Sequence, residues 1–362
     1  MFISPGSSNW AKISSGWQLN QGIKANGTLW SWGRNSEGQL ANNDEFAKST
    51  PVQEITFSTN WIDCSCIGNV AGGIKADNTL WLWGDNYAGG LCQNKNFATL
   101  PESSSPLQIY GGGSWKKIVV HSNYGAGGMK TDNTLWFWGS NFFGECGADT
   151  DNTSFAQYSS PVQEITLSTS WQDFDMGNSF TAALKNDGSL WLWGDNYAGQ
   201  LGDGTANERS SPVQEITNSS WKMASTGLNF TLAIKYDNTL WSWGANYDGQ
   251  LGQNSNVSIL LTPTQVGTDN NWAFVSAGDV VSLAIKSDGS LWSWGLNDEG
   301  QLAQNNIISY SSPTYVADTG DDWIWVGGMG AGLKLSPINT GTPIPSPSPS
   351  PSPTPTPTPT PT

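Results

Sequence analysis

The chain has 362 residues, of which 30 are acidic and 15 basic, so its formal net charge is −15 and only 12% of its residues are charged. This acidity argues against nucleic acid as a partner, because a phosphate backbone requires a basic surface. A single histidine, His121, excludes any metal site with two histidine ligands, and no apolar run reaches the ~18 residues of a membrane helix, so we expect no membrane insertion.

Residues 1–9 form the first segment, which begins Met1-Phe2-Ile3-Ser4-Pro5. The segment has neither the basic start nor the apolar stretch of a cleavable secretory signal. The sequence therefore predicts that any export would use another route.

Residues 10–337 are built from one repeated pattern, which makes this segment tryptophan-rich. The motif Leu-Trp-x-Trp-Gly occurs six times, at intervals of 50 to 55 residues. Its second tryptophans are Trp32, Trp83, Trp138, Trp193, Trp243 and Trp294. A further tryptophan opens each unit, at Trp10, Trp61, Trp115, Trp171, Trp221, Trp272 and Trp323. A lysine recurs at Lys24, Lys75, Lys130, Lys185, Lys235, Lys286 and Lys334. The chain thus contains six full repeats and a seventh that stops after its first half.

One repeat predicts a meander of four short strands. In the fourth repeat, residues 181–185 and 189–193 flank Asp187-Gly188, a dipeptide that tolerates the positive φ of tight hairpin turns. The two motif tryptophans are two residues apart and so project from one face of the strand, while often apolar residues project from the other. A strand that is apolar on both faces must be covered on both, which radially stacked four-stranded blades achieve.

The repeated Ser/Thr-Pro step near the end of each unit predicts an outermost fourth strand, where a missing N–H does no harm. No segment shows a helical apolar period, so we expect helices to be nearly absent. The predicted fold class is all-β: a seven-bladed β-propeller of four-stranded antiparallel blades with an incomplete last blade.

The repeat resembles the regulator-of-chromosome-condensation family, through Trp-x-x-apolar, apolar-Lys-x-Asp-Gly-x-Leu-Trp-x-Trp-Gly-x-Asn-x-x-Gly-Gln-Leu-Gly and Ser-Pro-Val-Gln. Residues 171–220 and 221–271 match it almost throughout, and the resemblance covers about residues 10–335. Kelch repeats are a weaker match, because their Gly-Gly signature is sporadic here. The resemblance implies seven blades and, for some members, nucleotide exchange on a small GTPase.

The seventh repeat lacks its last two strands, so ring closure needs a strand from elsewhere. Ile3-Ser4-Pro5 resembles the Ser-Pro step of the fourth strand, and we expect residues 1–9 to pair with residues 323–335. Residues 338–362 are a separate stalk or linker, in which Pro alternates with Ser or Thr. This composition favours extended polyproline II, roughly 50 Å long over residues 345–361. Such a spacer suggests an extracellular, envelope or virion surface in preference to the cytoplasm.

No residue is predicted to be catalytic, cofactor-binding or metal-binding. The paired tryptophans are interpreted as core, not as a sugar-stacking platform, and each repeated lysine as a stem lying over a tryptophan. His121 has no nucleophile at motif spacing. The four cysteines are interpreted as small apolar substitutes: Cys64, Cys66, Cys92 and Cys146.

The Gly-x-Asn-x-x-Gly-Gln-Leu loops form a ring on one rim, and their asparagines predict turn chemistry. These asparagines are Asn35, Asn86, Asn141, Asn196, Asn246 and Asn297. Specificity is expected where repeats differ, at Arg34, Asp85, Ser140, Asp195, Ala245, Leu296 and the stretches 41–49, 93–104 and 147–158.

The function predicted is that of a non-enzymatic interaction module: a monomeric propeller head on a Pro-rich stalk, binding a protein or other macromolecule through its rim loops. The alternatives are a carbohydrate-binding propeller, a small-GTPase nucleotide exchange regulator, and an enzyme built in the central channel. Fold alone does not decide among them.

Overall fold

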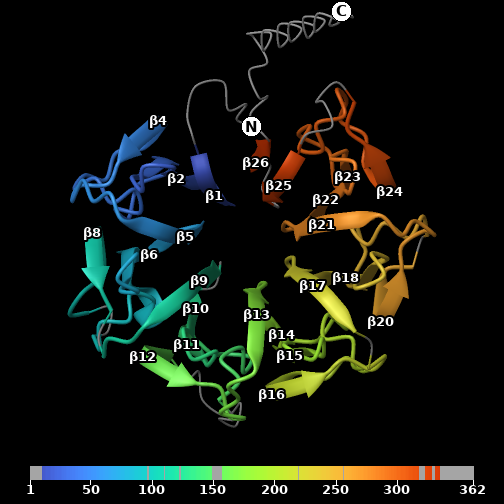
Figure 1. Ribbon diagram of the computed structural model, residues 1–362, viewed down its shortest axis with the longest axis horizontal. Helices are drawn as coiled ribbons and strands as arrows, with labels where there is room; N and C mark the ends of the chain where they lie inside the picture. The colour runs from blue at the N-terminus through green and yellow to red at the C-terminus, as the bar shows by residue number, and fades with distance from the viewer. Residues whose placement is uncertain are drawn as a thin grey trace, which may run out of the picture.

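A computed structural model describes most of the repeat segment and shows a ring of small sheets around a central axis (Figure 1). The described residues are 10–95, 98–109, 111–121, 124–148, 157–218, 220–255, 257–317, 323–327 and 331–334. The predicted closing segment 1–9 and the stalk 338–362 lie outside the described residues.

Each full repeat forms one four-stranded antiparallel sheet in which strand order follows chain order. Blade 1 contains β1 (Trp10–Gly16), β2 (Leu19–Lys24), β3 (Leu29–Gly33) and β4 (Lys48–Gln53). Blade 2 contains β5 (Trp61–Ile67), β6 (Val70–Lys75), β7 (Leu80–Asp85) and β8 (Glu102–Gln108), with the short 3-10 helix η1 (Tyr87–Gly89) before β8. Blade 3 contains β9 (Trp115–His121), β10 (Gly125–Lys130), β11 (Leu135–Ser140) and β12 (Gln157–Gln163).

The second half of the ring repeats this plan. Blade 4 contains β13 (Trp171–Met176), β14 (Phe180–Lys185), β15 (Leu190–Gly194) and β16 (Arg209–Gln214). Blade 5 contains β17 (Trp221–Thr226), β18 (Phe230–Lys235), β19 (Leu240–Ala245) and β20 (Ile259–Gln265). Blade 6 contains β21 (Trp272–Ala277), β22 (Val281–Lys286), β23 (Leu291–Gly295) and β24 (Tyr310–Tyr315). The first strand of each blade lies nearest the axis and the fourth lies at the periphery (Figure 1).

The seventh repeat forms a sheet of only two strands, β25 (Trp323–Gly327) and β26 (Ala331–Lys334). This sheet lies between blade 6 and β1 of blade 1 (Figure 1). The number of four-stranded blades in the described residues is therefore six and not seven. The reason lies in the sequence, because the Leu-Trp-x-Trp-Gly motif does not recur in residues 335–362. The all-β propeller itself is confirmed, and η1 is the only helix among the described residues.

The hairpin turns use positive φ in a way that differs from the simplest expectation. In blade 4, Lys185 N donates to Ser189 O at 2.9 Å and Gly188 N donates to Lys185 O at 2.9 Å. Gly188 has a φ of +80°, whereas Asp187 does not have a positive φ, so this is a three-residue loop and not a two-residue turn. The equivalent residue has a positive φ in all six full blades: Gly27, Asn78, Asn133, Gly188, Asn238 and Gly289.

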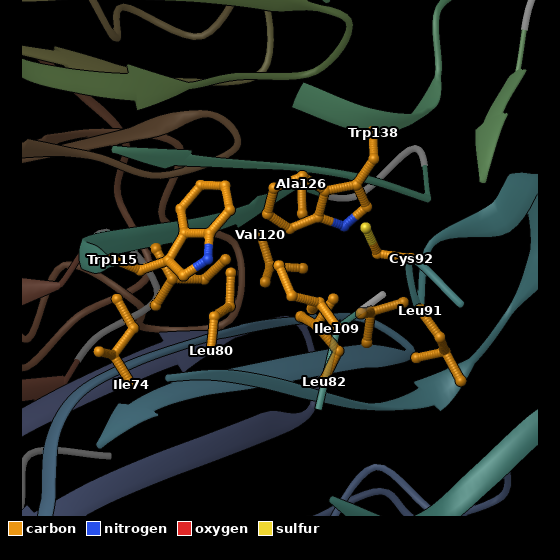
Figure 2. Close-up of a cluster of buried hydrophobic side chains, with 12 residues drawn as sticks. Ile74, Leu80, Leu82, Leu91, Cys92, Ile109, Trp115, Val120, Ala126 and Trp138 are labelled. Carbon is orange, nitrogen blue, oxygen red and sulfur yellow. The ribbon is translucent and has the colours of Figure 1, made fainter. Parts of the chain in front are cut away.

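The core consists of separate clusters between neighbouring blades. Figure 2 shows one such cluster, in which Leu80, Leu82 and Leu91 of blade 2 pack against Trp115 and Trp138 of blade 3. Both tryptophans are almost fully buried. The predicted burial of the third strand on both faces is thus confirmed.

In blades 2 to 6 the second tryptophan of the motif also makes a hydrogen bond between blades. Trp193 Nε1 of blade 4 donates to Glu145 O of blade 3 at 2.9 Å, and Thr181 Oγ1 donates to the same carbonyl at 2.9 Å. Gly147 follows close by, and a Cβ at this position would lie 2.7 Å from Trp193 Nε1, so the loop needs glycine there. The other indole donors, each with its carbonyl in the preceding blade, are Trp83 to Gln39, Trp138 to Gly90, Trp243 to Gln200 and Trp294 to Gln250.

The first tryptophan of each motif has a different environment, because it is only half-buried. Trp191 Nε1 donates to Ser189 Oγ at 2.9 Å, and that hydroxyl donates to Asp187 Oδ1 at 2.6 Å. The Lys185 ammonium lies 4.1 Å from the Trp191 ring centroid and 4.8 Å from that of Trp171. The prediction of a lysine over tryptophan is confirmed in the six full blades, whereas only the second tryptophan of each pair is full core.

Substitution of Trp193 by alanine is expected to destabilise the protein by about 3–5 kcal/mol, because it removes a buried indole and its bond to the preceding blade. Urea denaturation measures the change. Trp17→Ala is the control, because Trp17 is 56% exposed and should shift stability by no more than about 0.5 kcal/mol. An intact Trp193→Ala protein of unchanged stability would contradict this view of the core.

Candidate functional site

The two ends of the ring differ in the connections that form them. Adjacent strands run antiparallel, so the first-to-second and third-to-fourth strand connections share one end, which we call the loop face. The second-to-third strand hairpins and the connections between blades form the opposite end, which we call the hairpin face. The long variable connections of the repeat all lie on the loop face.

The repeated asparagines of the loop face hold the loops from inside. Asn196 is fully buried; its Oδ1 accepts the N–H of Leu201 at 3.0 Å, and its Nδ2 donates to Thr205 O at 3.1 Å and Asn207 O at 2.9 Å. In all six blades the asparagine Oδ1 accepts the N–H five residues further on. Their predicted role in turn chemistry is confirmed, because each of these side chains bonds within its own loop.

A row of exposed aromatic side chains lies on this face, and the sequence reasoning did not find it. Tyr87, Tyr197 and Tyr247 directly follow the buried asparagine and are 46%, 54% and 60% exposed. Phe143, in the equivalent loop of blade 3, is 37% exposed. We call these four residues the aromatic arc; it follows blades 2 to 5. An Asn-Tyr dipeptide shared by three repeats was the signal for it.

Most of the non-repeated positions that were expected to confer specificity have buried side chains. Asp85, Ser140, Asp195 and Ala245 are buried at the ends of third strands, where they shape the loops. Arg34 and Leu296 are half-buried. The exposed variable position is the one that follows the asparagine. Within the variable stretches, residues 96–97 and 149–156 lie outside the described residues.

The loop face carries an excess of negative charge. Burial and the adjacent carboxyl of Glu37 raise the pKa of Glu102, because carboxylates gather there without enough cations between them. The described acidic residues with exposed or half-exposed side chains near these loops include Glu37, Asp44, Glu45, Glu102, Glu208, Asp248, Asp298 and Glu299. The described basic residues there are Arg34, Lys48, Lys95 and Arg209. Three of them form ion pairs: Arg34 with Glu37, Lys48 with Asp44, and Arg209 with Asp203.

The hairpin face, by contrast, places a lysine near an aspartate in blades 2 to 6. Hydrogen bonds from Ser189 and the nearby Lys185 ammonium lower the pKa of Asp187. The same lysine and aspartate recur at the hairpins of blades 2 to 6. At these hairpins a cation therefore lies near each aspartate, whereas fewer basic than acidic side chains lie near the loops of the loop face.

The central channel contains a cavity of about 200 Å³, whose polar groups mainly link blades. Ser14 Oγ accepts the N–H of Cys66 at 3.0 Å, and Asp175 Oδ2 accepts the N–H of Thr226 at 2.9 Å. Two further serines act in the same way, Ser65 on Val120 and Ser225 on Ala277. These contacts tie the innermost strands together and indicate a structural role.

The single histidine and the cysteines are buried. Burial lowers the pKa of His121 to about 4, and Gly125 leaves space for its ring, because a Cβ there would lie 2.1 Å from Nε2. The four cysteines are free and buried, and burial raises the pKa of Cys66 to about 12. Their predicted role as small apolar residues is confirmed. In the described part of the chain, no group of three or more His, Cys, Asp or Glu could hold a metal ion, and no helix is long and apolar enough to span a bilayer.

Comparison with known proteins gives consistent matches to one repeat. A family model for the regulator of chromosome condensation (RCC1) repeat matches residues 26–69, 187–234, 237–285 and 288–328. A second model of the same repeat matches residues 10–39, 171–200 and 272–301. Together these models cover more than half of the chain.

Two curated relatives show how far the similarity extends. The Ultraviolet-B receptor UVR8 of Arabidopsis thaliana is 26% identical over 84% of this chain and 69% of its own length. The probable E3 ubiquitin-protein ligase HERC6 of Homo sapiens is 36% identical over 55% of this chain, but the match spans only 20% of the ligase. The match to the ligase therefore does not extend to most of that protein.

Two solved structures share the fold at low sequence identity. Prp20p from Saccharomyces cerevisiae superposes with a TM-score of 0.76 at 17% identity, covering 91% of this chain and 83% of that one. Human WBSCR16 superposes with a TM-score of 0.77 at 18% identity, covering 90% and 85%. These likenesses concern the propeller alone.

Replacing Asp175 by asparagine is expected to stabilise the protein more at about pH 7 than at about pH 4. Burial raises the pKa of Asp175, so the folded protein favours the neutral carboxyl. Wild-type stability therefore falls as the pH rises and folding has to bury the ionised carboxylate, a cost that asparagine does not have. Thermal melting of both proteins across this range measures the difference. A difference that stays constant with pH would contradict the assignment.

Proposed function

Because this chain belongs to the RCC1 repeat family, we propose that it is a non-enzymatic protein-interaction module whose loop face docks a basic segment of a partner. Relatives support proteins as the partners. Prp20p has binding properties toward Gsp1p and histones, and yeast RCC1 (Prp20) has also been solved with Kap60 bound to it. What this chain itself binds is argued from its own surface.

The observation that carries the proposal is the difference between the two faces. The hairpin face places a lysine near an aspartate in blades 2 to 6, whereas the loop face combines more carboxylates than basic side chains with the aromatic arc. Exposed aromatic rings and carboxylates together attract cationic side chains, through cation–π contact and Coulomb attraction. Charge complementarity therefore favours a basic partner.

The alternatives receive less support. The carbohydrate-binding interpretation relied on the paired tryptophans as a stacking platform, but the second of each pair is buried and the first is engaged by a lysine. The enzyme interpretation relied on the channel, where the polar groups are engaged in contacts between blades. Nucleotide exchange on a small GTPase stays a prediction from family membership, and the surface or virion setting stays a prediction from the tail.

We further propose that residues 1–9 complete the seventh blade and give it a third strand. β26 pairs only with β25 among the described residues, and it lies beside β1. Trp10 Nε1 is buried without a hydrogen-bond partner in the described part of the chain. A strand reaching this edge from the segment directly before Trp10 would close the ring.

Deletion of residues 1–8 is expected to lower the melting temperature, because it would leave the edge of β26 unpaired. Differential scanning calorimetry measures the change. Deletion of residues 345–362 is the control and should leave the melting temperature unaltered. Equal melting temperatures for the full chain and the N-terminal deletion would show the closure to be wrong.

The docking proposal predicts that a loop-face variant, Tyr87→Ala with Tyr247→Ala, loses partners that the wild-type chain retains. The matched variant, Phe57→Ala with Tyr236→Ala, removes two similarly exposed aromatic rings from the hairpin face and should retain them. Quantitative affinity capture at increasing salt compares the three proteins, and the retained amounts should fall with salt because screening weakens charge attraction. Loss of the same partners from the hairpin-face variant alone would overturn the proposal.

A further inference from the structure

The loops that leave the third strands of blades 2 and 4 begin with the same sequence. Residues 80–89 and residues 190–199 both read Leu-Trp-Leu-Trp-Gly-Asp-Asn-Tyr-Ala-Gly. The repeated motif accounts for the first leucine, both tryptophans, the asparagine and both glycines, which recur in all six full blades. The other four positions also coincide, and outside blades 2 and 4 only Tyr247 of blade 5 shares a residue with them. Blades 2 and 4 are therefore alike where the other repeats vary.

The identity is confined to this part of the two repeats. Residues 61–79 and 171–189 form the preceding halves of blades 2 and 4, and only four of these 19 positions are identical, those of Trp61, Asp63, Lys75 and Asp77. A recent duplication of a whole repeat would have left these halves alike as well. The shared loop sequence therefore indicates a requirement at the loop face and not the common origin of the repeats.

Each of the two loops fixes its tyrosine through a buried carboxyl group. Asp85 Oδ1 accepts the N–H of Tyr87 at 2.8 Å. Asp195 Oδ1 accepts the N–H of Tyr197 at 3.2 Å. Both aspartates are 8% exposed, whereas about half of each tyrosine is exposed. In blade 5 the aspartate is replaced by Ala245, so this bond is missing there. Blades 2 and 4 thus present their tyrosine rings in the same way.

The two loops are also held at a fixed separation. Gly89 lies against the fourth strand of blade 3, where a Cβ would be 2.8 Å from Ser159 Cα. Gly199 lies in the same way against the fourth strand of blade 5, where a Cβ would be 2.8 Å from Leu261 Cα. Blade 3 stands between the two loops, so a rotation of two blade positions about the ring axis relates them (Figure 1). The loop face therefore presents two like sites on one rigid support.

We propose that the Tyr87 loop and the Tyr197 loop are equivalent sites for one bivalent partner, which carries two like basic segments. A tyrosine ring attracts a cationic side chain to its face, and the excess of acidic over basic side chains on the loop face adds Coulomb attraction. Once one segment is bound, binding of the second is intramolecular, and this raises the affinity by about 10²–10⁴-fold. The inference rests on the proposed docking function and adds the number of segments that the loop face holds at once.

The test compares two fluorescent probes on the full chain, by anisotropy at low salt. The first probe is a Gly-Ser peptide with one cluster of lysines and arginines, and the second joins two such clusters by Gly-Ser linkers of graded length. The wild-type chain should bind the second probe about a hundredfold more tightly than the first at the best linker length. A two-cluster probe without a linker has the same charge but cannot span the two loops, so it should show little of this gain.

Tyr87→Ala and Tyr197→Ala are each expected to abolish the gain from linking. Affinity for the one-cluster probe should fall by no more than about twofold in either variant, because one of two like sites remains. The variant with both changes should bind both probes at least about tenfold more weakly. Tyr236→Ala is the matched control, because it removes a ring that is 55% exposed on the hairpin face, and it should keep the full gain. Melting temperatures confirm that each protein compared is folded.

Several results would overturn the bivalent arrangement. The two probes would bind the wild-type chain equally at every linker length, or a single variant would keep the gain. Loss of one-cluster binding in only one of the two single variants would show that the loops are not equivalent. Absence of binding by both probes would show that the loops do not hold basic segments.

This proposal and the docking face fail in distinguishable ways. If linking the clusters brings no gain while Tyr87→Ala with Tyr247→Ala still loses captured partners, the bivalent arrangement is wrong and the docking face stands. If that double variant retains every captured partner, the docking face is wrong whatever the probes do.

Discussion

The hydrogen bond from the second motif tryptophan of blades 2 to 6 to a carbonyl of the preceding blade is the interaction on which the ring depends. It joins a buried indole, which belongs to the third strand of one blade, to the loop that leads out of the third strand of the blade before it. The same contact that packs two blades together therefore also fixes the base of a variable loop. Burial of the indole excludes water from this bond, which makes the bond costly to break.

This arrangement explains why one end of the ring is available for recognition and the other is not. At the hairpin face Lys185 lies near Asp187 and its ammonium contacts two indoles, so most of the polar groups there interact within the repeat. At the loop face the repeated asparagines, such as Asn196, are buried and form hydrogen bonds with the loop backbone. The residues between these anchors are exposed and differ from blade to blade, as expected of loops displayed on a rigid scaffold.

The sequence was sufficient to predict the propeller, because a motif repeated at regular intervals with apolar residues on both faces of a strand has few other solutions. It also placed the lysine over tryptophan and the buried cysteines. It did not separate the two tryptophans of a pair, since residues two apart share a face yet differ in depth: Trp191 lies toward the hairpin face and Trp193 lies between blades.

The groove that lies between the loops of blades 3, 4 and 5 could not be predicted, because Phe143 and Asn229, which both line it, are far apart in sequence. Buried Glu54 was also missed, although its carboxylate accepts two backbone N–H groups and the indole of Trp61, a role that composition alone does not suggest.

Each of blades 2 to 6 carries an indole donor and each of blades 1 to 5 a carbonyl acceptor, so the repeat itself supplies both partners of the five joints between neighbouring full blades. A duplicated repeat would bring its own donor for the unit before it and its own acceptor for the unit after it. Duplication of a repeat can thus lengthen such a chain, and deletion of a repeat can shorten it, without any new kind of contact between blades. Mutation can alter a loop between its anchors while the joint is preserved. Trp32 of blade 1 is the exception to this scheme. Among the described residues the two-stranded sheet β25–β26, which precedes blade 1 in the ring, has no third-to-fourth strand loop to supply an acceptor. The joint between that sheet and blade 1 therefore needs contacts that the repeat does not supply.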